Sequence, residues 1–572
     1  MSKITGKVNY KQVLKGDTGY TFEPHVTVDG LLYWSNNGDL PNPLPVNIKG
    51  KDGDIIQNEL IESITDINLN EIVDNKIIKL SNINYYVNGN IELNNCEKLV
   101  GISLSTIKGK AVITFNKENV IIKNIKFKNT TMLYKYGGNI IFDNCEFEDI
   151  EKSCLFIRGG NAEFINCKCK NIGTNLNDDY TYLGGLVYAE NCESLNIFNC
   201  MCKNIHGQAC VRFTNLNKIN VENSIFNETK YRAIGGSLEY NETIGLIKNN
   251  SFLNIGKLNN LDGVGCNAIY TYRGSSKIDI LNNVFVNVVE NAIEGNYLNI
   301  KNNLFDTIGS ENYTTPSKEC IWGDIEHIEM NHFKNINLYP INKSLGGFTI
   351  KTINNNIFEK GDISKTNEAI RCLKFNANTV ISNNILIGYD YLLKIENNVL
   401  NNSKVFIKND YNKTLNPKGH YNNVYILKNN LIEYKNDYES FTKINDIKIN
   451  NANYVSFNDG ILKLSHNNTY DSFIYKEFNV KNDNIIMVDC NFIGENNGGI
   501  RIVPYNNDKW DYVNCREYYK SSNNEKINLH FVTVLKGKFR VEIIHQNYIK
   551  GNEYEISNLE ITLKENGGFI NE

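Results

Sequence analysis

A short phrase of polar and apolar residues recurs along the middle of the chain and sets its period. Each copy has Asn, a short spacer, an apolar or aromatic residue and often a second Asn, as between Asn124 and Asn129. The copies start at Asn124, Asn144, Asn166, Asn199, Asn223, Asn250, Asn283, Asn303, Asn331, Asn356 and Asn384. A unit of about 20 to 30 residues that recurs over hundreds of positions is typical of a solenoid, and the short β-like runs within this unit disfavour a helical one.

Stacking explains the phrase physically. If each repeat is one coil of a parallel β-solenoid, the Asn side chains fall at one turn and bond to the Asn above and below. The apolar neighbour then points inward onto its equivalents about 4.8 Å away, which is the spacing between strands. The phrase therefore predicts an all-β fold with a column of stacked side chains in its core.

With these residues, the chain resembles the right-handed parallel β-helix of pectate lyases and phage tailspikes over roughly residues 75 to 440. The resemblance implies the fold; the chemistry must come from the site. The calcium-carboxylate and Arg set of pectate lyases and the paired Asp motifs of polygalacturonases have no convincing copy here.

Residues 1–55 differ in kind, because Gly and Pro recur every few positions. They predict a small β-hairpin around Asp29 and Gly30 with extended links. This segment resembles the N-terminal module of tail fibres and tailspikes of phages of Gram-positive bacteria, with a Trp hairpin, a Pro-rich strap and collagen-like Gly triplets. We expect it to attach the protein to a virion, and residues 56–80 to form a neck or a cap on the solenoid. An ordinary linker is the alternative.

We assign residues 81–440 to the β-helix, 441–469 to closing strands and 470–572 to a C-terminal β-sandwich. Residues 470–572 alternate between apolar and polar positions in short runs with turns between them. The order of the runs is similar to that of jelly-roll carbohydrate-binding modules. A trimerising or capping sandwich is the alternative.

Charge and cysteine content narrow the function. The net charge of −4 disfavours nucleic acid as a partner. No run is apolar enough for membrane insertion, and the first twenty residues lack the apolar core of a signal peptide. Among the fourteen cysteines, Cys145, Cys167 and Cys200 recur in successive coils, and Cys169 and Cys202 replace the aromatic residue of the phrase. Because no CxxC pair has zinc spacing, we expect stacked, reduced core thiols and no metal or cofactor.

The strand that follows each phrase predicts an outward face. We align these strands on inward aliphatic residues at Leu155, Leu186, Val211, Ile234, Ile269, Ile293, Ile321, Phe348 and Ile370. Residues one and three positions beyond must then point outward. The first outward column is Phe156, Val187, Arg212, Gly235, Tyr270, Glu294, Trp322, Thr349 and Arg371; the second is Arg158, Ala189, Thr214, Ser237, Tyr272, Asn296, Asp324, Lys351 and Leu373.

These columns carry aromatic rings, Arg and carboxylates, whereas most of the remaining surface is Asn and Lys. Rings stack on the apolar faces of sugars, and forked polar groups bind hydroxyls. The predicted carbohydrate-binding residues are Arg212, Tyr270, Tyr272, Trp322 and Arg371. Strand propensity alone is the other explanation for the aromatic residues.

Glu294 and Asp324 are the predicted catalytic pair. They fall in adjacent coils, two positions apart along the strand, so their backbones should be separated by about 8 Å. An inverting pair of carboxylates lies about 6.5 to 9.5 Å apart. Long loops at residues 173–183, 256–265 and 309–318 are expected to wall this face.

The first functional hypothesis is a receptor-binding protein of a phage tail or tail-like particle. It would be a homotrimer that joins a tail or baseplate protein through its N-terminus and recognises a cell-surface polysaccharide of a Gram-positive host. The second is a polysaccharide depolymerase, either a glycoside hydrolase or a lyase, that acts on its substrate in the groove of the β-helix. The third is a bacterial pectate-lyase-like enzyme, which the N-terminal segment and the missing signal peptide disfavour.

Overall fold

The computed structural model divides the chain into two compact units, Met1–Ile61 and Glu62–Glu572. The structure describes residues 22–26, 31–36, 46–47, 76–80, 84–174, 183–237, 242–258, 265–272, 276–309, 319–343, 349–396, 403–408, 415–421, 424–427, 437–440, 448–450, 454–458, 461–465, 473–546 and 553–565.

The N-terminal unit contains the expected hairpin. Strand β1 (Phe22–Val26) pairs antiparallel with β2 (Leu31–Asn36), and β3 (Val46–Asn47) adds to β2. The two strands flank Asp29 and Gly30, as the sequence predicts. Most of the proposed neck, residues 56–75, falls outside the described residues.

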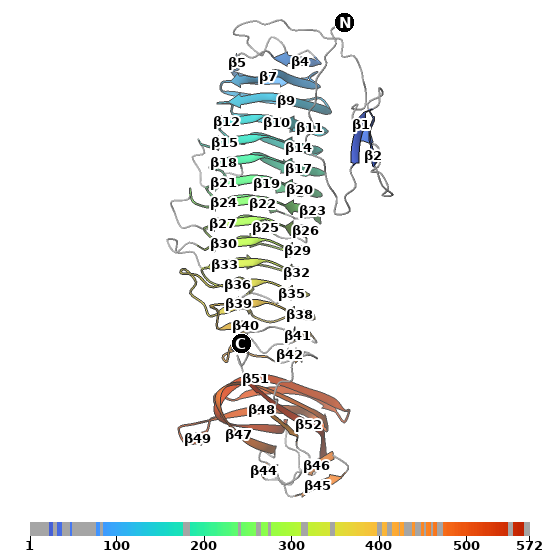
Figure 1. The fold of residues 1–572 in the computed structure, drawn as a ribbon, viewed down its shortest axis with the longest axis vertical. Helices are drawn as coiled ribbons and strands as arrows, with labels where there is room; N and C mark the ends of the chain where they lie inside the picture. The colour runs from blue at the N-terminus through green and yellow to red at the C-terminus, as the bar shows by residue number, and fades with distance from the viewer. Residues whose placement is uncertain are drawn as a thin grey trace. The chain divides into compact units, whose positions relative to one another are not determined.

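The second unit begins with a parallel β-solenoid whose coils stack one above another (Figure 1). One face is a thirteen-stranded parallel sheet. Its strands are β6 (Gly89–Leu93), β8 (Ala111–Phe115), β10 (Met132–Tyr136), β13 (Leu155–Arg158), β16 (Val187–Glu190), β19 (Ala209–Thr214), β22 (Arg232–Ser237), β25 (Ile269–Tyr272), β28 (Ile293–Glu294), β31 (Ile321–Trp322), β34 (Ile341–Lys343), β37 (Glu368–Cys372) and β40 (Tyr391–Ile395).

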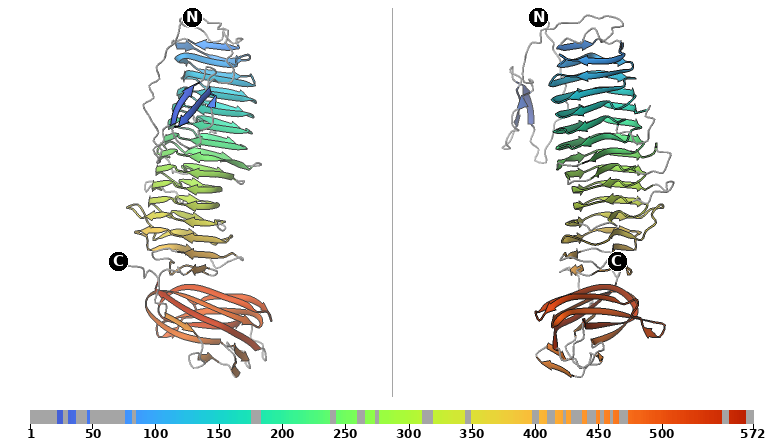
Figure 2. Two further views of the ribbon diagram at one scale, coloured as in Figure 1. Left: turned by 45° about the vertical axis from the view of Figure 1, so that its right-hand side comes forward. Right: turned by 180° about the vertical axis from the view of Figure 1, so that it is seen from behind.

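Two further strand columns complete each coil, as the views from other sides show (Figure 2). The long strands β7 (Lys98–Lys108) and β9 (Asn119–Lys128) run through both columns. One column continues with β4 (Ile77–Leu80), β11 (Asn139–Asp143), β14 (Asn161–Ile165), β17 (Ser194–Phe198), β20 (Lys218–Glu222), β23 (Thr243–Lys248), β26 (Ser276–Leu281), β29 (Tyr297–Lys301), β32 (Ile325–Glu329), β35 (Thr352–Asn354), β38 (Thr379–Ser382), β41 (Val405–Lys408) and β42 (Val424–Leu427). The other has β5 (Asn84–Tyr86), β12 (Glu146–Ile150), β15 (Lys168–Ile172), β18 (Met201–Ile205), β21 (Ile225–Thr229), β24 (Ser251–Ile255), β27 (Val284–Val288), β30 (Leu304–Ile308), β33 (His332–Ile336), β36 (Ile357–Glu359) and β39 (Ile385–Ile387).

The structure moves the start of the solenoid slightly. Strand β4 pairs with β7 in parallel, so residues 77–80 belong to a coil and not to a neck. In the described parts of the chain, no helix has the length and apolar composition needed to cross a membrane.

The Asn phrase resolves into two columns that lie one residue apart. Asn124, Asn144, Asn166, Asn199 and Asn223 have φ between 52° and 55°, a left-handed turn conformation that Asn tolerates well. The six later members of the phrase instead form a buried ladder. Each amide there donates to the Oδ1 of the next at 3.0 to 3.1 Å, from Asn250 through Asn283, Asn303, Asn331 and Asn356 to Asn384. The left-handed position in those coils belongs to the preceding residue, as at Asn249 and Asn282.

The cysteines occupy the same column as this buried ladder. Cys145, Cys167 and Cys200 directly follow the left-handed Asn, and their Sγ atoms contact backbone carbonyl oxygens of the preceding coil at 3.5 to 3.6 Å. The amide of Asn250 makes the equivalent bond to the carbonyl of Val221 at 2.8 Å. All fourteen cysteines are free thiols, thirteen of them buried. The predicted stack of reduced cysteines is confirmed.

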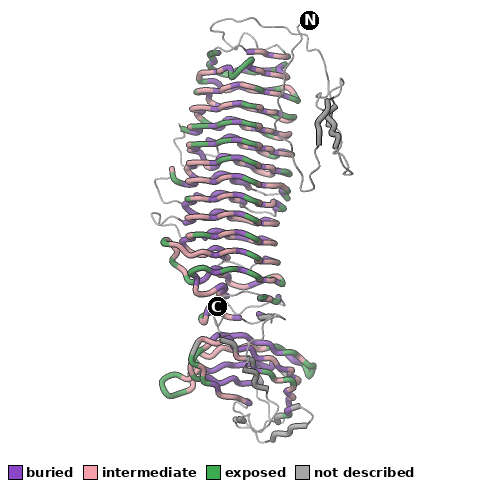
Figure 3. The backbone as a smooth tube through the Cα atoms, in the orientation of Figure 1, coloured by how far each residue is buried: buried purple, intermediate pink, exposed green. Residues whose placement is uncertain are grey.

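Aromatic rings form a second inner stack. Phe226, Phe252, Phe285, Phe305, Phe333 and Phe358 pack face to face with ring centroids 4.7 to 5.3 Å apart. Each coil therefore alternates buried and exposed positions, as the colouring in Figure 3 shows. The inward direction of the phrase's apolar residue is confirmed.

The C-terminal part is an antiparallel β-sandwich that begins earlier than expected. Its strands are β43 (Asp437–Ser440), β44 (Lys448–Asn450), β45 (Tyr454–Asn458), β46 (Ile461–Ser465), β47 (Phe473–Ile493), β48 (Glu495–Asn506), β49 (Lys509–Trp510), β50 (Arg516–Asn523), β51 (Ile527–Gln546) and β52 (Glu553–Glu565). Strand β43 pairs with β52, β44 with β47, and β45 joins β52 through β46, so these four strands belong to the sandwich and are not closing strands of the solenoid.

Strands β47 and β51 are each longer than the short runs that the sequence predicts, because each joins two such runs into one strand. Strand β47 continues through a bulge between Val480 and Asn484, and β51 continues from Ile527 to Gln546. A bulge bends a strand without ending it, and a polar interruption in the sequence does not distinguish the two cases.

Candidate functional site

One row of outward side chains runs across the thirteen-stranded sheet. We call it the outward row and define it by its strand register as Tyr188, Arg212, Gly235, Tyr270, Glu294, Trp322, Asn342 and Arg371. Tyr270, Glu294 and Trp322 pair directly across β25, β28 and β31. The structure thus brings these three predicted residues side by side at strand spacing.

In two coils the predicted assignment of inward and outward residues is wrong. Leu155 pairs with Val187 and not with Leu186, so Tyr188 and Glu190 face outward while Val187 and Ala189 are buried. Leu186 and Val187 are both buried and aliphatic, so the alternation alone could not fix the register.

In a later coil, Ile341 takes the inward position that was assigned to Phe348. The strand there is only three residues long. Thr349 and Lys351 therefore do not belong to the columns, and Asn342 does.

Glu294 lies in a polar, largely enclosed setting. Its Oε2 accepts hydrogen bonds from the amides of Asn267 at 2.8 Å and Asn291 at 3.1 Å. Burial raises the pKa of Glu294, and these bonds together with the charge of Arg232 oppose the shift. Its carboxyl is held in one place and titrates above its usual range.

Glu290 carries a second carboxyl near Glu294 and lies in the connection between β27 and β28. It is buried, and its Oε2 accepts the backbone N–H of Cys266 at 2.9 Å. Burial and the nearby charge of Glu294 raise the pKa of Glu290 to about 7. Two carboxyls whose pKa values are raised by burial, one of them to about 7, form the type of pair that acid–base catalysts use.

Arg232 stacks against the aromatic part of the row. Its guanidinium carbon lies 3.9 Å from the centroid of the Tyr270 ring, a close cation–π contact. The stacking fixes one face of the ring and leaves Arg232 beside both Glu290 and Glu294, whose pKa values its charge lowers.

Sequence reasoning missed Arg232, Asn267, Asn291 and Glu319, which precede the inward residue of their strands by two positions. Asn267, Asn291 and Glu319 precede their strands and Arg232 opens β22, so an alignment read only from the inward residue onward assigns no role to them. The signal was nevertheless present, because four successive coils carry a polar residue at this one position. Asn267 and Asn291 are only 1% exposed, and polar side chains are rarely so buried without a purpose.

Asp324 has separate partners from Glu294. It forms an ion pair with Lys343 and accepts a hydrogen bond from the hydroxyl of Thr349 at 3.0 Å. The register places it two residues beyond Trp322, in the coil next to Glu294. Its role as the second catalytic carboxylate stays a prediction, while Glu290 shares the surroundings of Glu294 directly.

The remaining predicted residues extend the row in both directions. Arg212 lies two strands before Tyr270, bonded to Gln208 and 5.6 Å from the ring of Tyr188. Arg371 lies two strands beyond Trp322, bonded to Glu396 at 2.9 Å and 5.0 Å from the ring of Tyr339.

Two parts of the predicted site are only partly visible. The backbone of Tyr272 ends strand β25, but its side chain is outside the described residues. The three walling loops also fall largely outside them, at residues 175–182, 259–264 and 310–318.

Several buried polar atoms of this face have no hydrogen-bond partner among the described residues. They are the Nε of Arg232, the Oδ1 of Asn291 and the Oδ1 of Asn342. These atoms are buried, and the accessible strip consists of the rings of Tyr270 and Trp322 with the carboxyl of Glu294 between them. Such a strip suits a hydroxyl-rich chain that lies along the coils.

The described residues also bring three cysteines together. The Sγ atoms of Cys169, Cys202 and Cys210 lie within 4.8 Å of one another in the core. Burial raises the pKa of the Cys169 and Cys202 thiols, whereas hydrogen bonds from these two thiols outweigh burial and lower the pKa of Cys210. All three side chains are buried and pack in the core of the solenoid.

Comparisons with known proteins add little to this geometry. No protein-family model and no curated protein matches the chain. Among solved structures, the enzymatically active domain of tailspike protein 4 of bacteriophage CBA120 is 10% identical, with 95% of this chain and 72% of that one covered at a TM-score of 0.22.

Two carbohydrate-binding modules also match. A CBM4 structure is 6% identical over 21% of this chain and 78% of its own, and a mutant of the family 29 module CBM29-2 is 13% identical over 22% and 89%, both at a TM-score of 0.17. These scores are too low to carry an argument about function, which rests on the residues above.

Proposed function

We propose that this protein binds a polysaccharide along the outward row. The observation that carries the proposal is the direct pairing of Tyr270, Glu294 and Trp322 across three strands, with Arg232 stacked on Tyr270. Rings two strand spacings apart, with the carboxyl of Glu294 on the strand between them, match the alternating apolar faces and hydroxyls of a sugar chain.

Binding of purified wall polysaccharide to the full chain tests this proposal. Trp322→Ala should weaken binding at least tenfold, because it removes a stacking surface from the centre of the row. Tyr136→Ala is the matched control, since Tyr136 is 54% exposed and precedes the row. Equal binding by the parent and by Trp322→Ala would rule out the row as the site.

Cleavage of the bound chain is a second candidate function, favoured by the pKa of about 7 at Glu290. Protonated Glu290 would donate its proton to the leaving glycosidic oxygen. Ionised Glu294 would attack the anomeric carbon or take a proton from the attacking water. Release of shortened chains from the polysaccharide, lost in Glu290→Gln and Glu294→Gln, is the outcome that this function requires.

The biological setting is proposed from the N-terminal segment. The hairpin and the Gly-rich and Pro-rich links of residues 1–55 support attachment to a phage tail or tail-like particle, where the protein would act as a receptor-binding homotrimer on a Gram-positive host. Light scattering tests the assembly. A mass of 65.3 kDa, that of one chain, would contradict the trimer.

A further inference from the structure

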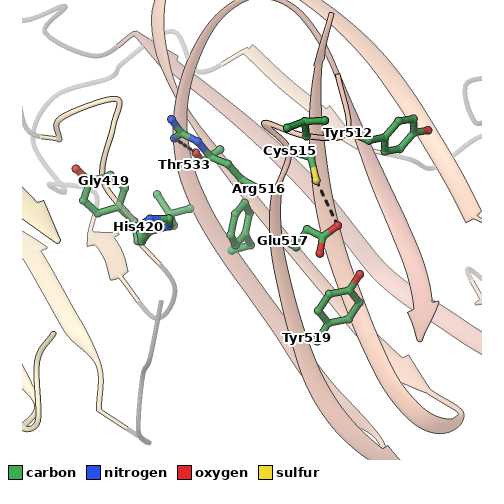
Figure 4. A pocket seen from close by; sticks show the side chains of 12 residues that line it. Gly419, His420, Tyr512, Cys515, Arg516, Glu517, Tyr519 and Thr533 are labelled. Carbon is green, nitrogen blue, oxygen red and sulfur yellow. Dashed lines mark hydrogen bonds between the residues drawn. The ribbon is translucent and has the colours of Figure 1, made fainter. Parts of the chain in front are cut away.

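A separate cavity lies where the end of the solenoid contacts the sandwich. It has a volume of about 480 Å³. Gly419, His420 and Tyr421 line one side, and residues of β50, β51 and the segment before β50 line the other (Figure 4). Arg516 donates to the carbonyl of Pro417, and the ring of His530 bonds to the carbonyl of Val424 at 2.8 Å. These bonds hold the two sides together.

Apart from Arg516, the polar groups that line this cavity are uncharged or acidic. Burial, and then the charge of Glu517, raise the pKa of Tyr519 to about 12, so its hydroxyl stays a donor. Burial, and then the charge of Arg516, lower the pKa of His420, so its ring is neutral near pH 7. A neutral imidazole offers one donor and one acceptor.

The cation in the lining is already engaged. Arg516 donates to Thr533, to the carbonyl of Val534 at 3.1 Å and to Pro417. Among the described residues that line the cavity it is the sole cation. The lining therefore matches hydroxyl groups better than it matches a carboxylate or phosphate ligand.

Tyr512 supplies an aromatic surface that is held rigidly. Its hydroxyl bonds to Glu542 at 3.3 Å, and the guanidinium carbons of Arg501 and Arg540 lie 4.8 and 5.2 Å from its ring centroid. Both arginines pair with Glu542, which is fully buried. A buried ion-pair triad is expensive to desolvate and is weak as a source of stability. Here it positions a ring that remains 42% exposed at the cavity.

We propose that this cavity is a second binding site, for a neutral sugar unit. The sugar would stack on Tyr512, and its hydroxyls would bond to Glu517, Tyr519 and His420. A fixed ring with a few convergent polar groups in a cavity of this size is the usual composition of a small-ligand site. The site shares no residue with the outward row, so it stands whether or not the row binds polysaccharide.

Titration of the full chain with three methyl glycosides tests the proposal. The probes are a neutral hexose, an N-acetylhexosamine and a hexuronic acid, followed by saturation-transfer NMR. All titrations are made both in the parent chain and in Trp322→Ala, so that binding at the outward row does not obscure the result. We expect saturable binding of a neutral glycoside in both backgrounds, at least fivefold tighter than that of the hexuronic acid.

Variants of the cavity then locate the binding. Tyr512→Ala and Glu517→Gln should each weaken it at least tenfold, whereas Tyr512→Phe, which keeps the ring, should change it less than threefold. Tyr136→Ala is the control. A thermal melt of each variant separates lost binding from lost folding, and Glu517→Gln decides the matter if Tyr512→Ala fails to fold. No saturable binding of any probe, a preference for the hexuronic acid, or equal binding by the parent and Glu517→Gln would overturn the proposal.

Discussion

Glu294 and Asp324 sit in adjacent coils and had the same expected role, yet their surroundings differ in kind. Glu294 is bonded to two buried amides and neighbours the buried carboxyl of Glu290, and its pKa is raised. Asp324 pairs with Lys343 and Thr349. Burial with a like charge prepares a carboxyl for proton transfer, whereas the carboxylate of Asp324 is engaged by a cation and a hydroxyl. Position on a shared face is thus a poor guide to chemistry, because the flanking turn decides the environment.

Cleavage assays separate the two carboxylates most strongly. Glu290→Gln should lower the rate of polysaccharide cleavage by about 100- to 10,000-fold, the usual contribution of a general acid. Asp324→Asn should lower it less than threefold, because its charge is already neutralised by Lys343. Chain shortening measured by size-exclusion chromatography gives both rates. Equal losses would restore Asp324 as the catalytic partner.

Stability against pH should depend on Glu290 as well. Its pKa is about 7 in the folded protein and about 4.5 when exposed, so the folded state holds a proton that the unfolded state has lost between these values. Stability is therefore full below pH 4.5 and falls as pH rises to 7, by about 3 kcal/mol for this group. Glu290→Gln should flatten the dependence in urea melts at pH 4.5 to 7. Asp324→Asn is the control and should leave the slope in place.

Polysaccharide binding should also distinguish the surroundings of Glu294 from those of Asp324, with smaller effects than those expected for cleavage. Tyr270→Ala should weaken binding about tenfold, because both the ring and the stacking partner of Arg232 are lost. Thr349→Ala, which removes the hydroxyl that donates to Asp324, should change it less than twofold. Isothermal titration with the wall polysaccharide measures both. A larger effect from Thr349→Ala would place the ligand on the Asp324 side.

The ion pair of Asp324 should contribute least. Lys343→Met should change the free energy of unfolding by at most about 1 kcal/mol, because partly exposed ion pairs are worth little. Denaturant titration gives the value. A loss of several kcal/mol would show that this side of the row is as enclosed as the Glu294 side.

The sequence by itself determined the solenoid, its inward stacks and most of the outward row. A repeated phrase puts the same type of residue at the same place in every coil. The period and the alternation therefore predict the inward direction of Phe285 and Cys167 and the outward direction of Tyr270 and Trp322. The N-terminal hairpin was also predictable, because local turn residues specify it.

Where this local pattern is ambiguous, only the tertiary structure decided which residues face inward and where the strands end. At Val187 two adjacent aliphatic residues fit the inward position equally well, so the register was ambiguous. At Ile341 the strand is only three residues long and shows too little alternation. In β47 a bulge interrupts the alternation although the strand continues. Glu290 precedes strand β28 and Arg232 opens β22, so both lie before the inward residue from which the alternation was read. The pKa of about 7 at Glu290 comes from burial and from Glu294 together. The cavity at Tyr512 is lined by both His420 and Glu517, which are nearly a hundred residues apart in the chain. Such long-range contacts depend on packing between elements, and no period along the chain records them.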